Sequence, residues 1–239
     1  MVIGAGGAVA ARPARQQAGE GAIPIPALHG PPFPAKAMRL AMIPLRVARE
    51  VCERRHYLHT YPGAAILNFG IFVRASLLGI AVIGLGPANV FRFFAGAERQ
   101  EVACLARFWL DDRLGRNSES RALGVLLRLL RRHQQTIKAL VGYSDPSVGH
   151  DGVIYRAAGF LFLGKSDASP YYRMADGRVL HSRTIAHVFG SRSKASLAAR
   201  GIKFETIEPR PKLTYVALID LTWRDRLTRP VLPYREAQG

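Results

Sequence analysis

Short apolar runs divide the middle of the chain into strand-length segments that are separated by charged, Gly or Pro residues. Such runs of seven to ten residues indicate buried strands. We expect strands at residues 38–44, 66–73, 77–86 and 102–110. The second and third runs are joined by Arg74-Ala75-Ser76, a turn short enough to predict an antiparallel hairpin.

Helical spacing appears in two places. Residues 45–57 carry apolar side chains at 45, 47, 48, 51 and 52 with charges between them, and the basic last turn suits the helix dipole. A longer helix begins near Asn117 or Ser118, either of which can cap it. Its apolar stripe at i, i+3, i+4 and i+7 consists of Leu123, Leu126, Leu127 and Leu130.

The segment 143–160 contains the densest group of chemically useful residues. An apolar run before it reads as a buried strand, Ser144-Asp145-Pro146 stops that strand, and a short helix follows from Val153. This order places Asp145, His150 and Tyr155 near the end of a strand, where open sheets commonly carry their chemistry. A structural interpretation remains open, in which Asp145 forms a turn and Tyr155 is a half-buried helix residue.

The C-terminal third alternates short strands with basic segments. We expect strands at residues 160–166 and 212–220, two short strands around Asp176-Gly177, and a small helical insert at 187–207. From residue 165 onward there are fourteen Lys and Arg against seven Asp and Glu. Basic residues interleaved with aromatics suit a phosphate backbone with an exposed base.

Composition limits the class of protein. The 239 residues, 49% of them hydrophobic, fit one domain with appendages. Residues 1–36 are rich in Ala, Gly and Pro without apolar periodicity, which predicts a disordered arm. No apolar run reaches 18 residues and only two cysteines occur, so we expect a cytoplasmic protein that does not enter a membrane and keeps its thiols reduced.

The net charge is +17, which indicates a polyanionic partner. Nucleic acid is the first candidate, a membrane surface the second, and solubility alone the third.

Several motifs carry a family resemblance. The element order, with Tyr155 in a short helix that ends in Ala-Gly-Phe, resembles the GNAT acyltransferase fold, an α/β (α+β) mixed sheet flanked by helices. Residues 38–235 are also similar to the Mom family of bacteriophage DNA-modification proteins. The motifs concerned are RHYLH, LARFWLDD, NSESRALG, YSDPSVGHDGVIYRAAGF, DGRVLHSR and KLTYVALI with RPVLPY.

The resemblance implies an activity and a domain plan. Mom-like proteins add a carbamoylmethyl group to the exocyclic amino group of adenine in phage DNA, which protects that DNA from host restriction. The substrate would be double-stranded DNA, in keeping with the charge. We expect a GNAT-like catalytic core at residues 37–185, and an extension at 186–239 that completes the core and contacts DNA.

The donor remains open at this stage. Acetyl-CoA enzymes of this fold carry a Gly-rich loop before the long helix, whereas residues 114–121 here contain one Gly. A glycine-derived donor such as an aminoacyl-tRNA, with tRNA as a second partner, therefore stands beside acetyl-CoA. Either donor would be held at the start of the long helix by Arg116, Asn117, Ser118, Ser120 and Arg121.

The resemblance suggests roles for the remaining candidates. Asp145 would act as the base or orient it, and Tyr155 would act as the acid, with His56 and Tyr57 facing the same cleft. A helix-capping role for His56 is the alternative. His56, His150 and Asp145 offer metal ligands, iron included, but their spacing is not diagnostic, so no metal site is predicted.

DNA contacts are expected from basic and polar residues outside this group, which are Arg107, His150, His181, Ser182, Arg183, Arg226 and Arg229. A solvated strand end or hairpin end would explain several of them equally well. Two other functions remain open, an acetyl-CoA-dependent N-acyltransferase acting on a small amine or a protein, and a non-catalytic DNA-binding protein. A homodimer is also open.

Overall fold

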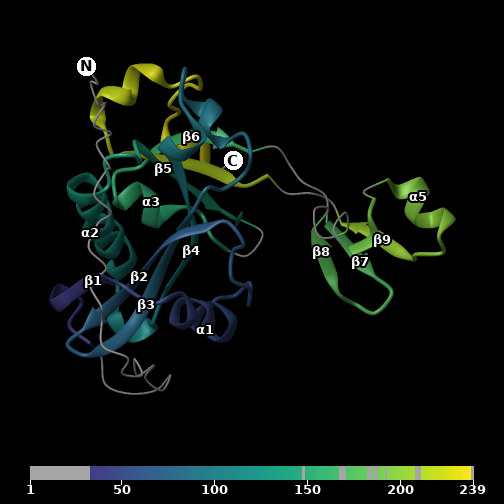
Figure 1. Cartoon of the computed structure of the whole chain (residues 1–239), viewed down its shortest axis with the longest axis horizontal. Coiled ribbons are helices and arrows are strands. Elements are labelled where there is room, and N and C mark those ends of the chain that lie inside the picture. Colours follow the sequence, from purple (N-terminus) through teal and green to yellow (C-terminus); the bar gives the residue numbers. More distant parts are fainter. Residues whose placement is uncertain are drawn as a thin grey trace, which may run out of the picture.

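The computed structural model describes residues 33–146, 149–166, 171–181, 185, 188–191, 193–207 and 211–237. Its main element is a seven-stranded sheet with the order β1-β2-β3-β4-β5-β10-β6 (Figure 1). The strands are β1 (Met38–Met42), β2 (Ala65–Val73), β3 (Ser76–Gly84), β4 (Val102–Leu110), β5 (Ala139–Ser144), β6 (Leu161–Lys165) and β10 (Leu213–Leu218). All neighbours pair antiparallel except β4 and β5, which are parallel.

Helices cover both faces of this sheet. Alternate residues of β3 point to opposite faces, as the two-residue period of a strand requires. Ile80 and Val82 pack with α1 (Leu45–Arg55). Ala81 and Ile83 pack with α2 (Ser118–His133) and α3 (Val153–Ala157). The predicted mixed sheet flanked by helices is therefore confirmed.

Helix α2 has the predicted buried stripe. Leu123, Leu126 and Leu130 are fully buried, and Leu127 is nearly so. The helix follows Asn117, whose φ of 63° lies in the left-handed region that Asn tolerates. The Asn117 side chain makes no capping hydrogen bond, contrary to the capping role expected for it.

Strands β4 and β5 separate along their length. Their parallel ladder joins Val102 to Ala139 and ends at Cys104 and Val141. Strand β4 nevertheless continues to Leu110, and its register with β3 shifts between the pairs Val82–Arg107 and Ile83–Leu105. Ala106 is therefore the extra residue of a β-bulge, which bends a strand away from its neighbour. The split between the two strands opens the sheet on the side of α3.

A second, three-stranded sheet lies beside the main sheet in Figure 1. It consists of β7 (Tyr171–Met174), β8 (Val179–His181) and β9 (Phe204–Ile207) in the order β8-β7-β9, and it packs with α5 (Lys194–Ala199). The prediction of a helical insert at 187–207 is wrong for its last four residues, because Phe204–Ile207 is a strand that pairs antiparallel with β7. The boundary predicted at residue 185 falls between β8 and β9.

The C-terminal segment returns to the main sheet. Trp223 is buried against Phe94, and the Leu232 amide donates to the Phe162 carbonyl at 2.9 Å. The 3-10 helices are η1 (Ala35–Ala37), η2 (Val90–Phe93), η3 (Arg99–Glu101), η4 (Asp112–Leu114), η6 (Leu221–Arg226) and η7 (Tyr234–Ala237).

Of the arm predicted at residues 1–36, residues 1–32 lie outside the described residues. Within the described residues, no helix has both the length and the apolar composition of a membrane span.

Candidate functional site

The split between β4 and β5 contains a cavity of about 520 Å³, which we call the α3 cavity. The end of α1 and the following loop form one wall, and residues 149–155 form another. Residues 105–110 of β4 form the wall between them.

A second cavity of about 640 Å³, the basic cavity, adjoins the first. It extends toward η2, the end of β6 and the start of β10. The lining residues common to both cavities are Tyr57, Leu58, Leu105, Ala106, Arg107 and Tyr143. The cavities therefore meet at the β4 bulge.

The charges of the two linings differ. In the α3 cavity, Arg55 and Arg107 are matched by Glu119 and Asp151. The described lining of the basic cavity contains no Asp or Glu, and its cations are Arg107, Lys165, Lys212 and Arg229. A polyanion is therefore favoured in the basic cavity and not in the α3 cavity.

His56 is neutral and has a fixed tautomer. It is 4% exposed, and its Nδ1 accepts the Leu58 amide at 3.1 Å. Burial, together with the positive charge of the nearby Arg107, lowers the pKa of His56 to about 4. Because Nδ1 accepts, the neutral ring carries its proton on Nε2. His56 can therefore donate a hydrogen bond at neutral pH, but it is a poor base.

Tyr57 links the end of α1 to the loop after β5. Its ring stacks on His56 with centroids 4.5 Å apart, and meets the edge of His150 at 5.4 Å. Partial burial raises the pKa of the Tyr57 phenol, while Lys212 and Asp145 act on it in opposite directions. The phenol thus stays protonated at neutral pH, in the wall common to both cavities.

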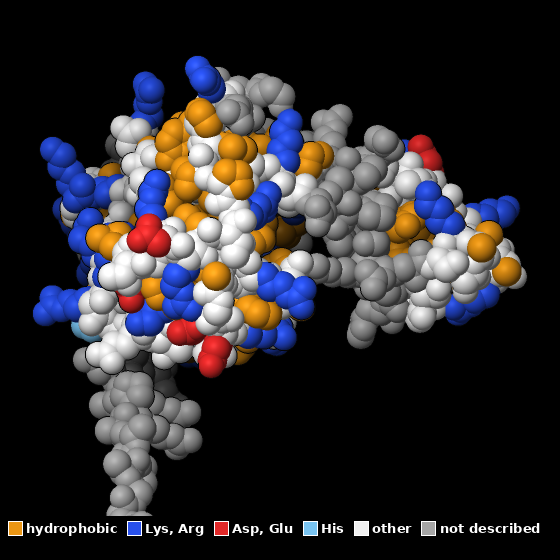
Figure 2. All heavy atoms as spheres, turned by 90° about the horizontal axis from the view of Figure 1, so that it is seen from above, with side chains coloured by type: hydrophobic (Ala, Val, Ile, Leu, Met, Phe, Trp, Pro, Cys, Tyr) orange, Lys and Arg blue, Asp and Glu red, His pale blue; other side chains and the backbone are white. Residues whose placement is uncertain are grey.

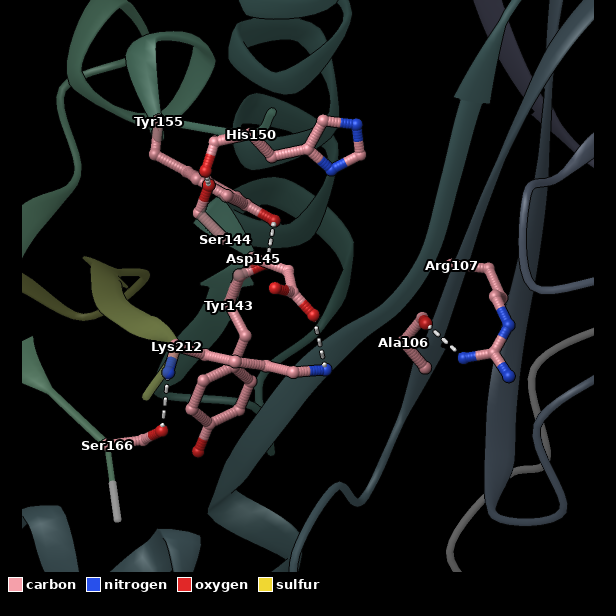
Figure 3. A network of polar contacts seen from close by, with 9 residues as sticks. All are labelled: Ala106, Arg107, Tyr143, Ser144, Asp145, His150, Tyr155, Ser166 and Lys212. Atoms are coloured by element: carbon pink, nitrogen blue, oxygen red, sulfur yellow. Dashed lines mark hydrogen bonds and ion pairs between the residues drawn. The ribbon is translucent and has the colours of Figure 1, made fainter. Parts of the chain in front are cut away.

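Asp145 forms an ion pair with Lys212, with Nζ and Oδ2 3.5 Å apart (Figure 3). The antiparallel register pairs Leu213 with Ser144, which sets these two residues opposite each other just beyond the ladder. The Lys212 amide also donates to Ser166 Oγ at 3.1 Å. Asp145 itself belongs to neither described lining. Its neighbour Ser144 lines the α3 cavity and its partner Lys212 lines the basic cavity, so Asp145 lies between the two.

Tyr155 lies in the wall of the α3 cavity and is buried. Its ring stacks on Tyr215 at 5.1 Å, and its hydroxyl donates to the Tyr143 carbonyl over a long 3.4 Å. Burial raises the pKa of Tyr155. Across from it, a Cβ on Gly142 would lie 2.4 Å from the ring, so the ring position requires glycine there. Tyr155 is thus a protonated phenol with one weak partner.

Arg107 is fixed in the common wall rather than extended into solvent. Its Nε donates to the Thr60 carbonyl at 2.9 Å, and its Nη2 donates to Thr60 Oγ1 at 3.0 Å. Its Nη1 donates to the Ala106 carbonyl at 2.7 Å (Figure 3). Arg107 therefore holds the loop that carries His56 and Tyr57 against the bulge.

The five predicted donor-binding residues gather at the start of α2 without lining either cavity; only Glu119 from that turn lines the α3 cavity. Several of their polar side chains form hydrogen bonds with backbone carbonyls of this protein. The hydroxyl of Ser118 donates to the Leu114 and Gly115 carbonyls at 2.6 and 2.8 Å. Ser120 donates to the Asn117 carbonyl at 3.1 Å, and Arg121 to the Lys36 carbonyl at 3.1 Å. Arg116 and Asn117 are exposed.

The residues predicted to contact DNA are dispersed. Arg107 and His150 line the α3 cavity, and Arg229 lines the basic cavity, where its guanidinium lies 5.2 Å from the Phe93 ring. Arg226 packs over Trp223 at 4.0 Å outside both cavities. His181 ends β8 in the second sheet, and Ser182 and Arg183 lie outside the described residues.

Two residues that the sequence did not single out line the basic cavity. Lys212 is the first residue of the motif KLTYVALI, yet its proximity to Asp145 depends on the pairing of β5 with β10. Asn89 begins η2, and its side chain makes no capping hydrogen bond. Neither position has a local sequence signal for function.

Metal and thiol chemistry have no candidate group among the described residues. No cluster of three or more His, Cys, Asp and Glu able to hold a metal ion occurs there. Cys52 and Cys104 are buried, and burial raises the pKa of their thiols to about 11 and about 12. Both therefore remain un-ionised and unreactive at neutral pH.

Fold and site together define an α/β protein whose split sheet opens into two adjoining cavities, with the Asp145–Lys212 ion pair between them. The chain belongs to the Mom protein family, which matches residues 37–236, and the family prediction is thereby confirmed. A relative named methylcarbamoylase mom, from Escherichia phage Mu, is 30% identical over 155 residues. This alignment covers 64% of the chain and 64% of the phage Mu protein, which is less than two thirds of that protein's length.

Two solved acetyltransferases align with this chain. The aminoglycoside acetyltransferase AAC(6')-Ib, solved with acetyl-CoA, aligns with a TM-score of 0.44 and 13% identity, over 80% of this chain and 99% of its own. The ribosomal-protein-S18-alanine N-acetyltransferase from Escherichia coli aligns with a TM-score of 0.42 and 14% identity, over 77% and 95%.

Proposed function

We propose that this protein is a transferase that adds a carbamoylmethyl group to the exocyclic amino group of adenine in phage DNA. Membership of the Mom family and the name of the phage Mu relative support this activity. The observation that carries the proposal is the position of Asp145 between the two cavities. The charged residues in the α3 cavity balance one another, whereas those in the described lining of the basic cavity are all Lys or Arg.

The reaction requires two proton movements. The amino nitrogen forms a bond to the donor methylene carbon as the bond from that carbon to the leaving group breaks. The Asp145 carboxylate takes the proton that the amino group loses, and the Tyr155 phenol donates a proton to the leaving group. Because burial raises its pKa, the phenol remains available as an acid at neutral pH and suits a strongly basic leaving group.

Neighbouring residues would bind and orient the substrates. His56 and Tyr57 would form the cleft wall, and His56 Nε2–H would donate to a substrate oxygen. Arg107 would hold that wall in place through Thr60. The start of α2, from Arg116 to Arg121, would hold the donor at the outer end of the α3 cavity.

The acetyl group of acetyl-CoA has neither a nitrogen nor a leaving group on its methyl carbon, so acetyl-CoA fits only the alternative of an N-acyltransferase, and the carbamoylmethyl donor would be a glycine-derived compound such as an aminoacyl-tRNA. With glycyl-tRNA, the amine leaves the methylene carbon as ammonia, which then displaces the tRNA hydroxyl from the ester and forms the amide. The Glu119 carboxylate in the lining of the α3 cavity disfavours phosphate groups inside it, so only the aminoacyl end of a tRNA would enter this cavity. Isothermal titration with acetyl-CoA, and separately with glycyl-tRNA, distinguishes the two. Acetylation of amines in vitro would instead favour an N-acyltransferase.

DNA would bind the face shown in Figure 2, where Lys and Arg side chains surround apolar groups and few acidic side chains appear. The proposed DNA contacts are Arg226, Arg229 and His150, together with His181 at the end of β8 and with Ser182 and Arg183. The protein would act in the host-cell cytoplasm. Whether it acts as a monomer or homodimer is decided by sedimentation of the protein–DNA complex.

Mass spectrometry of nucleosides tests the proposal. Plasmid DNA from cells that express the protein should contain an adenosine heavier by a carbamoylmethyl group. DNA from cells expressing Asp145→Ala at equal protein level should lack it. Unmodified DNA with both proteins would contradict the proposal, and DNA binding without modification would support the non-catalytic alternative.

A further inference from the structure

The basic cavity has the size and lining of a nucleobase site. Its volume of about 640 Å³ falls in the range of small-molecule sites, roughly 300–1,000 Å³. Four aromatic side chains contribute to its walls, which are Tyr57, Phe93, Tyr143 and Tyr171. Flat aromatic faces can stack on any base, and cations at the same opening can hold the flanking phosphates.

The Lys and Arg residues of the basic cavity are placed to hold the phosphates that flank a bound base. Arg229 lies over Phe93, and one of its nitrogens donates to the Lys165 carbonyl at 3.1 Å. A guanidinium has five N–H donors, so several remain for phosphate oxygens. Lys165 and Lys212 line the same cavity, and no acidic residue occurs in its described lining.

Asn89 gives this cavity a means of recognising a base. Its carboxamide is the one amide side chain in the described linings of the two cavities. The side chain is exposed and is not used to cap η2. An Asn carboxamide can accept from the N6 amino group of adenine and donate to N7, a pairing that no other base offers in the same form.

We infer that the basic cavity is the pocket for an adenine turned out of the DNA duplex, and that Asn89 recognises its edge. Stacked base pairs hide the amino group, so an enzyme that modifies it must bind the base outside the helix. A base in this cavity lies on the Lys212 side of Asp145, while the α3 cavity on the other side is left for the donor. This inference rests on the proposed function and assigns a role to each cavity.

A binding experiment with pre-displaced bases tests the inference. Fluorescence anisotropy would compare a duplex that has one bulged adenine with the same duplex fully paired. Because the cost of unstacking is already met, the wild type should bind the bulged duplex about tenfold more tightly. A bulged purine without the amino group should lose most of this preference.

Three variants locate the effect. Asn89→Ala should lower the bulged-to-paired affinity ratio to near one without affecting binding to paired DNA. Lys212→Gln should weaken binding to both duplexes. Arg46→Gln removes the same charge from an exposed position at the other end of α1, and should match the wild type. An unchanged ratio in Asn89→Ala would overturn the role of Asn89.

Photolabelling provides a readout that does not depend on variants. A duplex with 8-azidoadenine at the bulge should label Phe93 or Tyr171, which line the basic cavity and not the α3 cavity. Labelling confined to Tyr155, His59 or Trp109 would place the base in the α3 cavity and overturn the inference. If cellular DNA is unmodified but Asn89-dependent binding persists, the proposed activity fails and the adenine pocket stands. If cellular DNA is modified but the protein does not prefer the bulged duplex, the proposed activity stands and the adenine pocket fails.

Discussion

The α3 cavity and the basic cavity share the bulged wall of β4 but differ in the side chains that surround it. The α3 cavity has balanced charge and contains the buried phenol of Tyr155, packed by Tyr215 and Gly142. The basic cavity has four cations, no described acidic residue, and an exposed amide at Asn89. One region is thus suited to proton donation by a buried phenol, and the other to holding a polyanion.

The comparison makes Asp145 the most sensitive position, because it stands between the two regions. Asp145→Asn keeps the shape of the side chain but removes the negative charge and the ability to take a proton. We expect the initial rate of adenine modification to fall by at least about 100-fold, in line with the loss of a general base. Nucleoside mass spectrometry at several times after induction measures that rate.

Asp112→Asn is the matched control for Asp145→Asn, because Asp112 is an exposed aspartate outside both linings. Its modification rate should equal that of the wild type. If Asp145→Asn also modifies DNA at the wild-type rate, the carboxylate is not the proton acceptor.

Tyr155→Phe examines the α3 cavity alone. The ring packing survives and only a 3.4 Å hydrogen bond is lost, so the melting temperature should change little. The modification rate should fall about 10- to 100-fold through loss of the acid. Tyr215→Phe is the matched control, since it also removes a buried phenol with one long hydrogen bond, of 3.3 Å. Equal rates for the two variants would argue against an acid role for Tyr155.

His56 predicts how stability depends on pH. Its folded pKa, about 4, lies below its ordinary value of 6.5, so the unfolded chain binds the proton more readily between these values. The neutral buried ring therefore stabilises the fold fully above pH 6.5, and this stabilisation is lost as pH falls toward 4. The loss should be on the order of 2 kcal/mol.

Urea unfolding at pH 7.5 and pH 4.5 measures this change, with His56→Asn as the comparison, because its amide can still accept the Leu58 amide proton without titrating. The pH dependence of unfolding should be shallower in His56→Asn. Parallel curves for the two proteins would show that other groups dominate.

The sequence predicted the local elements well, because each has a local cause. The leucine stripe defined α2, and the short turn after Val73 defined the β2–β3 hairpin. The separation of β4 from β5 and the Asp145–Lys212 pair depend on contacts between strands far apart in the chain, for which periodicity contains no information. The same limit explains β9, whose four residues form a strand only because β7 is available as a partner.

Candidate site residues were also predicted well where they lie in one local segment, and poorly where they depend on distant contacts. Asp145, His150 and Tyr155 were placed together correctly near one strand end, because they belong to a single strand–loop–helix segment. Residues at the start of α2 were expected to bind the donor from their order relative to a family pattern, and the structure places them beside the α3 cavity without lining it. Asn89 lies in a loop whose function depends entirely on what surrounds it.

The smallest expected effect separates the two cavities by charge. Each Lys or Arg that neutralises a phosphate contributes nearly one to the slope of log affinity against log salt. Arg229→Gln, in the basic cavity, should reduce the magnitude of that slope for duplex DNA by about 1. Arg55→Gln, in the α3 cavity, should leave the slope unchanged, since Arg55 faces a lining that already contains Glu119 and Asp151. Equal slopes for both variants would mean that DNA phosphates do not distinguish the cavities, and the assignment of the polyanion to one of them would then rest on the photolabelling result alone.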